Sequence, residues 1–148
     1  MEEIGMIYYI QGLNKKAEKY FLKAIDITNK KLGKDNLFTA KVLLRLGDLY
    51  YNKSLYKKAD EYYLLSLNIF EKTLGANSPE VGAYLSRVGM SLSEQKLFTK
   101  AEEYFLRSLN ILEKSLGENH PKVAEVYKWM GHMYTLQSKH KLAAASHR

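Results

Sequence analysis

The sequence contains no cysteine, only two prolines and no long apolar run. Without cysteine the chain has no disulfide framework, no thiolate metal site and no cysteine nucleophile, and it suits a reducing compartment. No apolar stretch approaches the ~20 residues that a membrane-spanning helix needs. The composition, 46% hydrophobic and 26% charged, is typical of an ordered chain. We therefore expect an ordered protein that does not insert into a membrane.

Sequence motifs of catalysis are missing as well. The chain has no P-loop, no G-x-G-x-x-G, no G-x-S-x-G and no H-E-x-x-H. Its four histidines, His120, His132, His140 and His147, are not spaced as metal ligands with acids alongside. We therefore expect no enzyme activity, no cofactor, no metal site and no small-molecule substrate.

The N-terminal segment and the net charge bear on location and partners. The segment MEEIGMIYYIQG is acidic where a signal peptide would be basic, and its apolar run is short, so we expect a cytoplasmic protein. A net charge of +7 raises nucleic acid as a partner. However, lysines are mixed with acids on most of the expected helices. A generally basic, solvated surface is the favoured interpretation, and nucleic-acid binding is the less favoured one.

What the sequence does contain is a repeat of 42 residues. The segment KADEYYLLSLNIFEKTLG at 58–75 returns as KAEEYFLRSLNILEKSLG at 100–117 and as KAEKYFLKAIDITNKKLG at 16–33. Thirteen of the nineteen pairs that align 57–75 with 99–117 are identical. A period of this size indicates stacked supersecondary units. We divide the array 1–148 into repeats at 1–36 (partial), 37–78, 79–120 and 121–148 (truncated), a pattern that a fragment of a longer protein would also give.

Apolar residues at helical spacing predict two antiparallel helices in each complete repeat. We expect three helix pairs and a partial fourth, beginning with helices over 2–11 (Met1, Ile4 and Tyr8 inward) and 15–31. The expected buried positions of the first helices are Leu43, Leu46, Gly47, Tyr50, Leu85, Val88, Gly89, Leu92, Tyr127, Met130, Gly131 and Tyr134. Those of the second helices are Ala17, Phe21, Ala24, Ile25, Thr28, Ala59, Tyr63, Ser66, Leu67, Phe70, Ala101, Phe105, Ser108, Leu109 and Leu112.

Helix ends follow from a few residues. Gly33 and Gly75 stand where a helix C-terminus favours a positive φ. Ser78 and Pro79 supply a capping hydroxyl and a proline in the first turn of the next helix. The small Gly47, with its counterparts one repeat apart, marks where two helices must approach closely, because a larger side chain would push the backbones apart.

These residues resemble the tetratricopeptide repeat, and the resemblance covers nearly the whole chain. First helices carry a large apolar residue, then leucine-glycine and tyrosine; second helices carry alanine, an aromatic and a small residue. The long period and the connector LGENHPKVA at 116–124 are similar to the kinesin-light-chain and nephrocystin subclass. The resemblance implies an all-α, right-handed superhelical solenoid of stacked antiparallel helix pairs. It also implies a protein-binding scaffold whose first helices line a concave groove.

The face opposite the buried one should then meet a ligand. The expected groove residues are Lys41, Arg45, Asp48, Tyr51, Asn52, Arg87, Met90, Glu94, Lys128, Trp129 and His132. Met6, Tyr9, Ile10, Ala83, Glu125 and Leu136 lie on the same stripe or its flank. Arg45, Arg87 and Trp129 occupy one repeat position, and such a row suits a peptide with carboxylates and an apolar anchor. The alternative is that the arginines are solvated, or paired with Asp48 and Glu94, and that Trp129 packs against the end of the array.

Three functions remain open from the sequence. The favoured hypothesis is an adaptor that binds a protein or peptide segment, acidic with an apolar or aromatic anchor, in the concave groove. The second is a structural or regulatory array inside a larger enzyme or signalling protein, acting through its convex face or ends. The third is nucleic-acid binding with bases stacked on tyrosine, although Tyr8, Tyr50, Tyr63, Tyr127 and Tyr134 are better explained as core residues.

Overall fold

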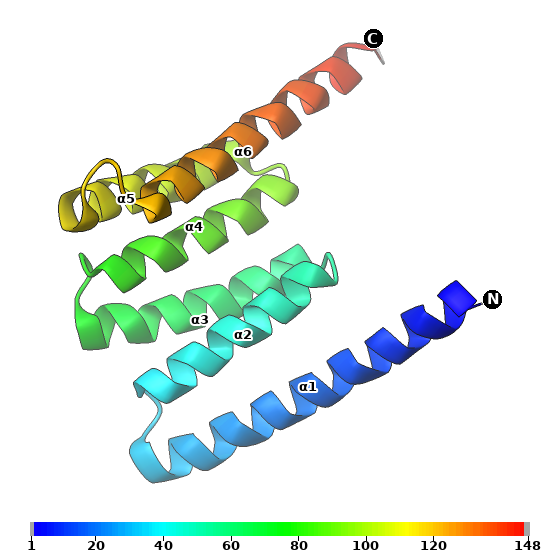
Figure 1. Ribbon diagram of the computed structural model, residues 1–148, viewed down its shortest axis with the longest axis vertical. Coiled ribbons are helices and arrows are strands. Elements are labelled where there is room, and N and C mark those ends of the chain that lie inside the picture. The colour runs from blue at the N-terminus through cyan, green and yellow to red at the C-terminus, as the bar shows by residue number, and fades with distance from the viewer. Residues whose placement is uncertain (1, 147–148) are drawn as a thin grey trace.

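The computed structural model describes the backbone of residues 2–146 and the side chains of residues 10–146, and it contains six helices (Figure 1). The helices are α1 (Glu2–Leu32), α2 (Leu37–Asn52), α3 (Tyr56–Leu74), α4 (Pro79–Glu94), α5 (Phe98–Leu116) and α6 (Pro121–Ser146). They are stacked in chain order, with α1 at one end and α6 at the other (Figure 1). None of the helices in residues 2–146 is both long and apolar enough to cross a membrane. The all-α expectation is confirmed.

Two complete helix pairs, α2–α3 and α4–α5, form the middle of the array. Each pair turns through one residue with a positive φ, Ser54 at 63° and Lys96 at 66°. The expected end signals are confirmed. Ser78 accepts a hydrogen bond from the backbone amide of Val81, and Gly75 ends α3 with φ 94°. The Ser78 side chain pairs a backbone amide that would otherwise lack a partner at the start of α4, and Gly75 allows the chain to leave α3.

Inside each pair the helices are close because one of them carries glycine. A Cβ on Gly89 would lie 2.8 Å from Cε1 of Phe105, and Gly47 stands against Tyr63 in the same way. A serine forms a second contact between the two helices of each pair: Ser66 Oγ donates a hydrogen bond to the backbone carbonyl of Ala40 at 2.6 Å. Ser108 makes the same 2.6 Å bond one repeat later, to the carbonyl of residue 82. The repeat pattern is therefore a pattern of helix-to-helix contacts.

The core runs through both pairs without interruption. All the core positions expected in repeats 37–78 and 79–120 are buried. Phe70, Leu85, Phe105 and Leu112 are each no more than 2% exposed. Since one helix pair cannot bury its apolar face alone, contacts between successive pairs stabilise the array.

The expected hairpin in the first repeat is wrong. Residues 2–32 form one continuous helix, and Gly12, the counterpart of the turn residues Ser54 and Lys96, lies inside it. Continuing the helix adds one hydrogen bond per residue and avoids the unpaired groups of two new ends. The inward positions expected at Met1, Ile4 and Tyr8 lie outside the described side chains.

The last repeat also departs from expectation. α6 runs straight through Ser138, the counterpart of Ser54, and buries Val123, Val126, Met130 and Met133. Of its expected core residues only Met130 is buried, whereas Tyr127 is 55% and Tyr134 is 45% exposed. Gly131 has no atom within 4 Å of the Cβ it lacks. These residues were predicted to face a second helix, and within residues 2–146 no second helix covers them.

Candidate partner-binding groove

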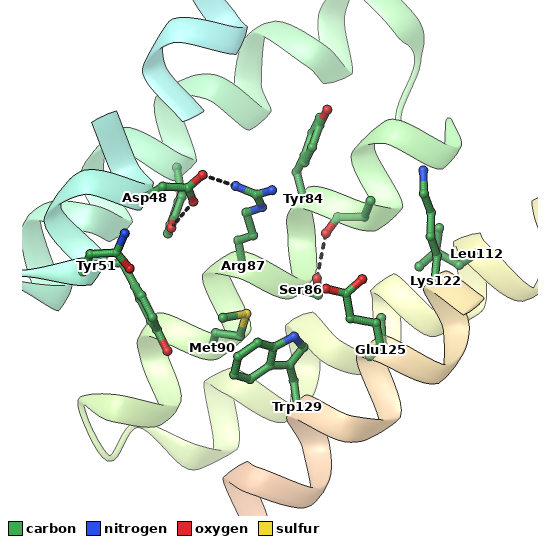
Figure 2. Close-up of a pocket in the computed structure, with 14 residues that line it drawn as sticks. Asp48, Tyr51, Tyr84, Ser86, Arg87, Met90, Leu112, Lys122, Glu125 and Trp129 are labelled. Atoms are coloured by element: carbon green, nitrogen blue, oxygen red, sulfur yellow. Dashed lines mark hydrogen bonds and ion pairs between the residues drawn. The ribbon is translucent and has the colours of Figure 1, made fainter. Parts of the chain in front are cut away.

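A cavity of about 550 Å³ opens between the first helices of successive units, and we call it the groove (Figure 2). Its lining residues are Asp48, Tyr51, Asn52, Tyr63, Ala83, Tyr84, Ser86, Arg87, Met90, Leu112, Lys122, Glu125, Val126 and Trp129. Most of them come from α2, α4 and α6, at spacings of three and four residues that place them on one face of each helix. The opposite faces of α2 and α4 carry Gly47 and Gly89, which contact α3 and α5, and we call these two contacts the glycine seams. Each of these first helices therefore packs against its second helix on one face and lines the groove with the other.

One wall of the groove is an ion pair between two units. The guanidinium of Arg87 on α4 donates to Asp48 Oδ2 on α2, and the hydroxyl of Tyr63 donates to Oδ1 of the same carboxylate at 2.7 Å. The Arg87 guanidinium also lies 5.7 Å from the ring centre of Tyr84. Burial, followed by the hydrogen bond to Asp48, raises the pKa of Tyr63. This wall is therefore fixed in position and close to neutral in charge.

The apolar part of the groove lies around Trp129. Trp129 and Met90 are both half-buried, and they come from neighbouring units (Figure 2). Lys128 Nζ lies 5.6 Å from the centre of the indole, and the ring of His132 meets it edge-on at 6.2 Å. Trp129 thus keeps part of its surface free within residues 10–146, beside a flexible methionine that adapts to what it contacts.

A second contact between units lies beyond the groove, toward the C-terminal end of α4. His132 Nε2 and Glu94 Oε1 are 2.9 Å apart. Glu94 also acts on Tyr51, whose ring meets that of Tyr56 edge-on at 5.2 Å. Burial, then the charge of Glu94, then Tyr56, raises the pKa of Tyr51 to about 12. Tyr51 is therefore a neutral hydrogen-bonding group at physiological pH.

The expected groove residues divide into two groups. The structure brings Asp48, Tyr51, Asn52, Arg87, Met90 and Trp129 together around one cavity. It leaves Lys41, Arg45, Glu94, Lys128 and His132 outside the lining. The row of Arg45, Arg87 and Trp129 is therefore incomplete at the cavity, because Arg45 is an exposed residue of α2. Of the two pairings weighed from the sequence, Arg87 with Asp48 forms, whereas Glu94 pairs with a histidine.

Some stripe residues lie elsewhere. The side chains of Met6 and Tyr9 lie outside the described residues, and Ile10 is 50% exposed on α1. Ala83 and Glu125 do line the groove, as their place on the stripe predicts. Leu136 lines a smaller hollow near Phe98 and His140 instead. None of the residues that the structure describes form a cluster of three or more His, Cys, Asp or Glu side chains suited to a metal ion.

Sequence reasoning missed Tyr84 and Lys122, which also line the groove. Tyr84 follows Ala83 and lies three residues before Arg87, on the flank of its stripe, and Lys122 lies three residues before Glu125. Tyr84 would have been found by including that flank, and Lys122 by extending the stripe of its helix by one turn toward the helix start, since residues three apart share a face.

The stacked pairs and the groove between their first helices define the class of the protein as an α-solenoid repeat protein. The sequence model of the family described as tetratricopeptide repeat matches residues 1–72 and 80–148. The chain belongs to the tetratricopeptide-repeat family. Its kinesin-light-chain-like character, expected from the connector and the period, is confirmed together with the solenoid fold.

Comparison with solved structures gives a similar result. The chain is similar to the crystal structure of BtubC (BKLC) from P. vanneervenii, at 26% identity and a TM-score of 0.75. The match covers 86% of this chain and 50% of that chain, so the present sequence spans about half its length. No curated protein matches the sequence. Repeats of this family suggest a protein–protein interaction scaffold with protein partners, and the family is typically non-catalytic.

Proposed function

We propose that the chain is a non-catalytic scaffold that binds a peptide segment of a partner protein in the groove. The observation that carries the proposal is the half-buried Trp129, which stands with Met90 in an open cavity of about 550 Å³. Tryptophan in a concave, partly apolar site is a common anchor of protein recognition. The absence of cysteine favours a reducing compartment, and we propose a cytoplasmic scaffold.

The charges of the groove suggest the kind of peptide. Cationic side chains outnumber carboxylates among the charged residues that line the groove or were expected in it, namely Lys41, Arg45, Asp48, Arg87, Glu94, Lys122, Glu125 and Lys128. Arg87 is already engaged by Asp48, which makes Lys122, on the lining, the better partner for a ligand carboxylate. We therefore propose an acidic peptide with an apolar or aromatic anchor, the anchor at Trp129 and the carboxylate near Lys122.

Preorganisation supplies the mechanism. The groove walls are held by contacts between units, such as Arg87 with Asp48, so little of the site has to become ordered when a ligand binds. The scaffold positions the peptide and carries out no chemical step.

A display selection from a random peptide library, followed by titration of the selected peptides, tests the proposal. Wild-type protein should enrich acidic sequences with an aromatic or large apolar residue. Trp129→Ala and Lys122→Glu should each weaken the selected peptides about tenfold or more, since such contacts are worth roughly 1–3 kcal/mol. Leu106→Ala and Lys114→Glu, exposed positions on α5 outside the lining, are the matched controls and should bind like wild type.

Other results would move the conclusion. A wild-type protein that enriches no peptide would favour the alternative of a structural or regulatory segment that acts through its convex face or its ends. Equal loss of binding in Trp129→Ala and Leu106→Ala would show that the peptides bind elsewhere. Binding of nucleic acid with steep salt dependence and little sequence preference would favour the charge-based alternative instead.

A further inference from the structure

Among the residues that the structure describes, the last helix presents an uncovered copy of the surface that the middle helices bury. Ala124, Tyr127, Gly131 and Tyr134 on α6 lie one repeat after Gly82, Leu85, Gly89 and Leu92 on α4. In α4 this face packs on α5, and Leu85 is 0% and Leu92 is 7% exposed. In α6 the corresponding Tyr127 and Tyr134 are 55% and 45% exposed. We call these four α6 residues the open face.

The surface of α1 that corresponds to the paired face of α3 and α5 is also exposed. Ile69 on α3 and Ile111 on α5 are 6% and 4% exposed, whereas Ile27, one repeat earlier on α1, is 57% exposed. Tyr62 stacks on Tyr50 with ring centres 5.5 Å apart, whereas its counterpart Tyr20 is 65% exposed. Another side of α1 is occupied, because Ile25 packs against the core and Glu18 accepts a hydrogen bond from Tyr50. Phe21 contacts the core with only part of its side chain and is half-buried.

The uncovered surface of α6 corresponds to the first helix of a complete pair, and that of α1 corresponds to the second helix. We propose that α6 of one copy packs antiparallel on α1 of a second copy. The register is set by the two pairs inside the chain. Gly131 would face Phe21 of the second copy, as Gly89 faces Phe105. Tyr134 would stack on Tyr20, as Tyr50 stacks on Tyr62.

A third contact completes this register. Ala124 would meet Ile27, as Gly82 meets Ile111, whose Cγ2 lies 2.8 Å from the Cβ position of that glycine. One bond of the complete pairs would be missing, because α1 has Ala24 where Ser66 and Ser108 donate to a backbone carbonyl. The junction should therefore be weaker than the seams inside the chain.

The proposed contact is continuous with an established interface. α6 already packs on α4 and α5 through Val123, Val126, Met130 and Met133, so an added helix would extend the same seam by one step. Both end helices run straight through their turn positions, Gly12 and Ser138, and neither folds back over its uncovered surface. Different surfaces meet at this junction, so each dimer keeps one free surface of each kind and further copies can add in a row.

Charge sets the conditions for association. Both α1 and α6 carry more lysine than acid, so the two surfaces repel at low ionic strength. Raising the salt screens this repulsion, because the Debye length falls from ~30 Å at 0.01 M to about 8 Å at 0.15 M. Association should therefore strengthen with salt.

Sedimentation equilibrium over a range of protein concentrations tests the proposal. The weight-average mass of the wild type should rise with concentration, without levelling off at a dimer, and should rise further with added salt. Gly131→Leu, which fills the open face, and Ile27→Lys, which charges the other surface, should each remain monomeric alone. Mixed in equal amounts they should form a dimer that grows no further, because each variant keeps the surface that the other lacks.

The variants are chosen so that loss of folding cannot mimic the result. A Cβ at Gly131 meets no atom within 4 Å, and Ile27 is mostly exposed, so circular dichroism and thermal melting should match the wild type. Leu106→Ala on α5 is the control and should associate like the wild type. A wild type that stays monomeric at every concentration and salt overturns the proposal. Ile27→Lys that still associates while Gly131→Leu does not would indicate contact between two α6 helices and would also overturn it.

Discussion

The Cβ that any other residue would carry at position 89 lies 2.8 Å from Cε1 of Phe105, whose side chain is 0% exposed. We therefore predict that Gly89→Leu lowers the free energy of unfolding by about 1–3 kcal/mol or more, because a buried ring has no space to move into. Gly131→Ala, at the same repeat position but in open space, should be neutral or stabilising by about 0.5–1 kcal/mol. Urea unfolding followed by circular dichroism measures both. Equal destabilisation by the two variants would contradict the assignment of the seam.

Substitutions of the two arginines that were expected in the groove, Arg45 and Arg87, should differ in their effect on stability. Arg87→Glu would place a second carboxylate against Asp48, whereas Arg45 is exposed and outside the cavity lining. The Arg87 and Asp48 side chains are 35% and 37% exposed, so we predict a modest loss of about 1 kcal/mol for Arg87→Glu. Arg45→Glu should stay within about 0.5 kcal/mol of wild type.

Salt separates these two outcomes further. The loss in Arg87→Glu should shrink in urea titrations at high ionic strength, since the pair is partly open to solvent. A salt-independent loss, or an equal loss in Arg45→Glu, would mean that the ion pair is not its cause.

A buried carboxylate on α3 should make stability depend on pH. Asp60 is 8% exposed and accepts a hydrogen bond from Gln95 through Oδ2, while Oδ1 has no partner among residues 10–146. Burial raises the pKa of Asp60 above 3.8. Between pH 3.8 and the raised pKa, Asp60 binds more protons in the folded state than in the unfolded state. Asp60 therefore makes the free energy of unfolding fall as the pH rises through this interval.

Asp60→Asn tests this prediction. The wild type should lose stability relative to the variant as pH rises from below 3.8, and the variant should be the more stable of the two at neutral pH. Urea unfolding of both proteins across this range measures the difference. The opposite slope would indicate that Gln95 stabilises the charged carboxylate more than burial opposes it.

The complete repeats were predictable because their signals are redundant. Gly47, Ala59 and Ser66 each point to a close helix contact, and the next repeat says the same at Gly89, Ala101 and Ser108. Caps at Ser78 and Gly75 fixed the helix ends locally. Each such signal depends on residues near in sequence, and the structure agrees with all of them.

The end repeats could not be predicted in the same way. Gly12 and Ser138 suit a turn as well as Ser54 does, but a turn forms only where the returning helix finds a surface that offsets its cost. The prediction that Tyr127 and Tyr134 are buried was wrong for a related reason: the sequence pattern identifies the apolar face of a helix but does not tell whether a partner helix covers it. Arg45 and Lys122 show the corresponding limit at the groove: helical periodicity gives the face, but the position of the cavity along it depends on how the helices are staggered.

The groove crosses unit boundaries, whereas each glycine seam lies within one unit. Its side chains Asp48, Arg87 and Trp129 come from three consecutive units. A permuted chain in which residues 37–78 and 79–120 exchange places would keep both seams, because each segment carries its own glycine, aromatic and serine. It would nevertheless bring Arg45 and Asp48 next to Trp129, and so change the side chains of the groove. In this fold the order of the units determines the composition of the groove, even where their content stays the same.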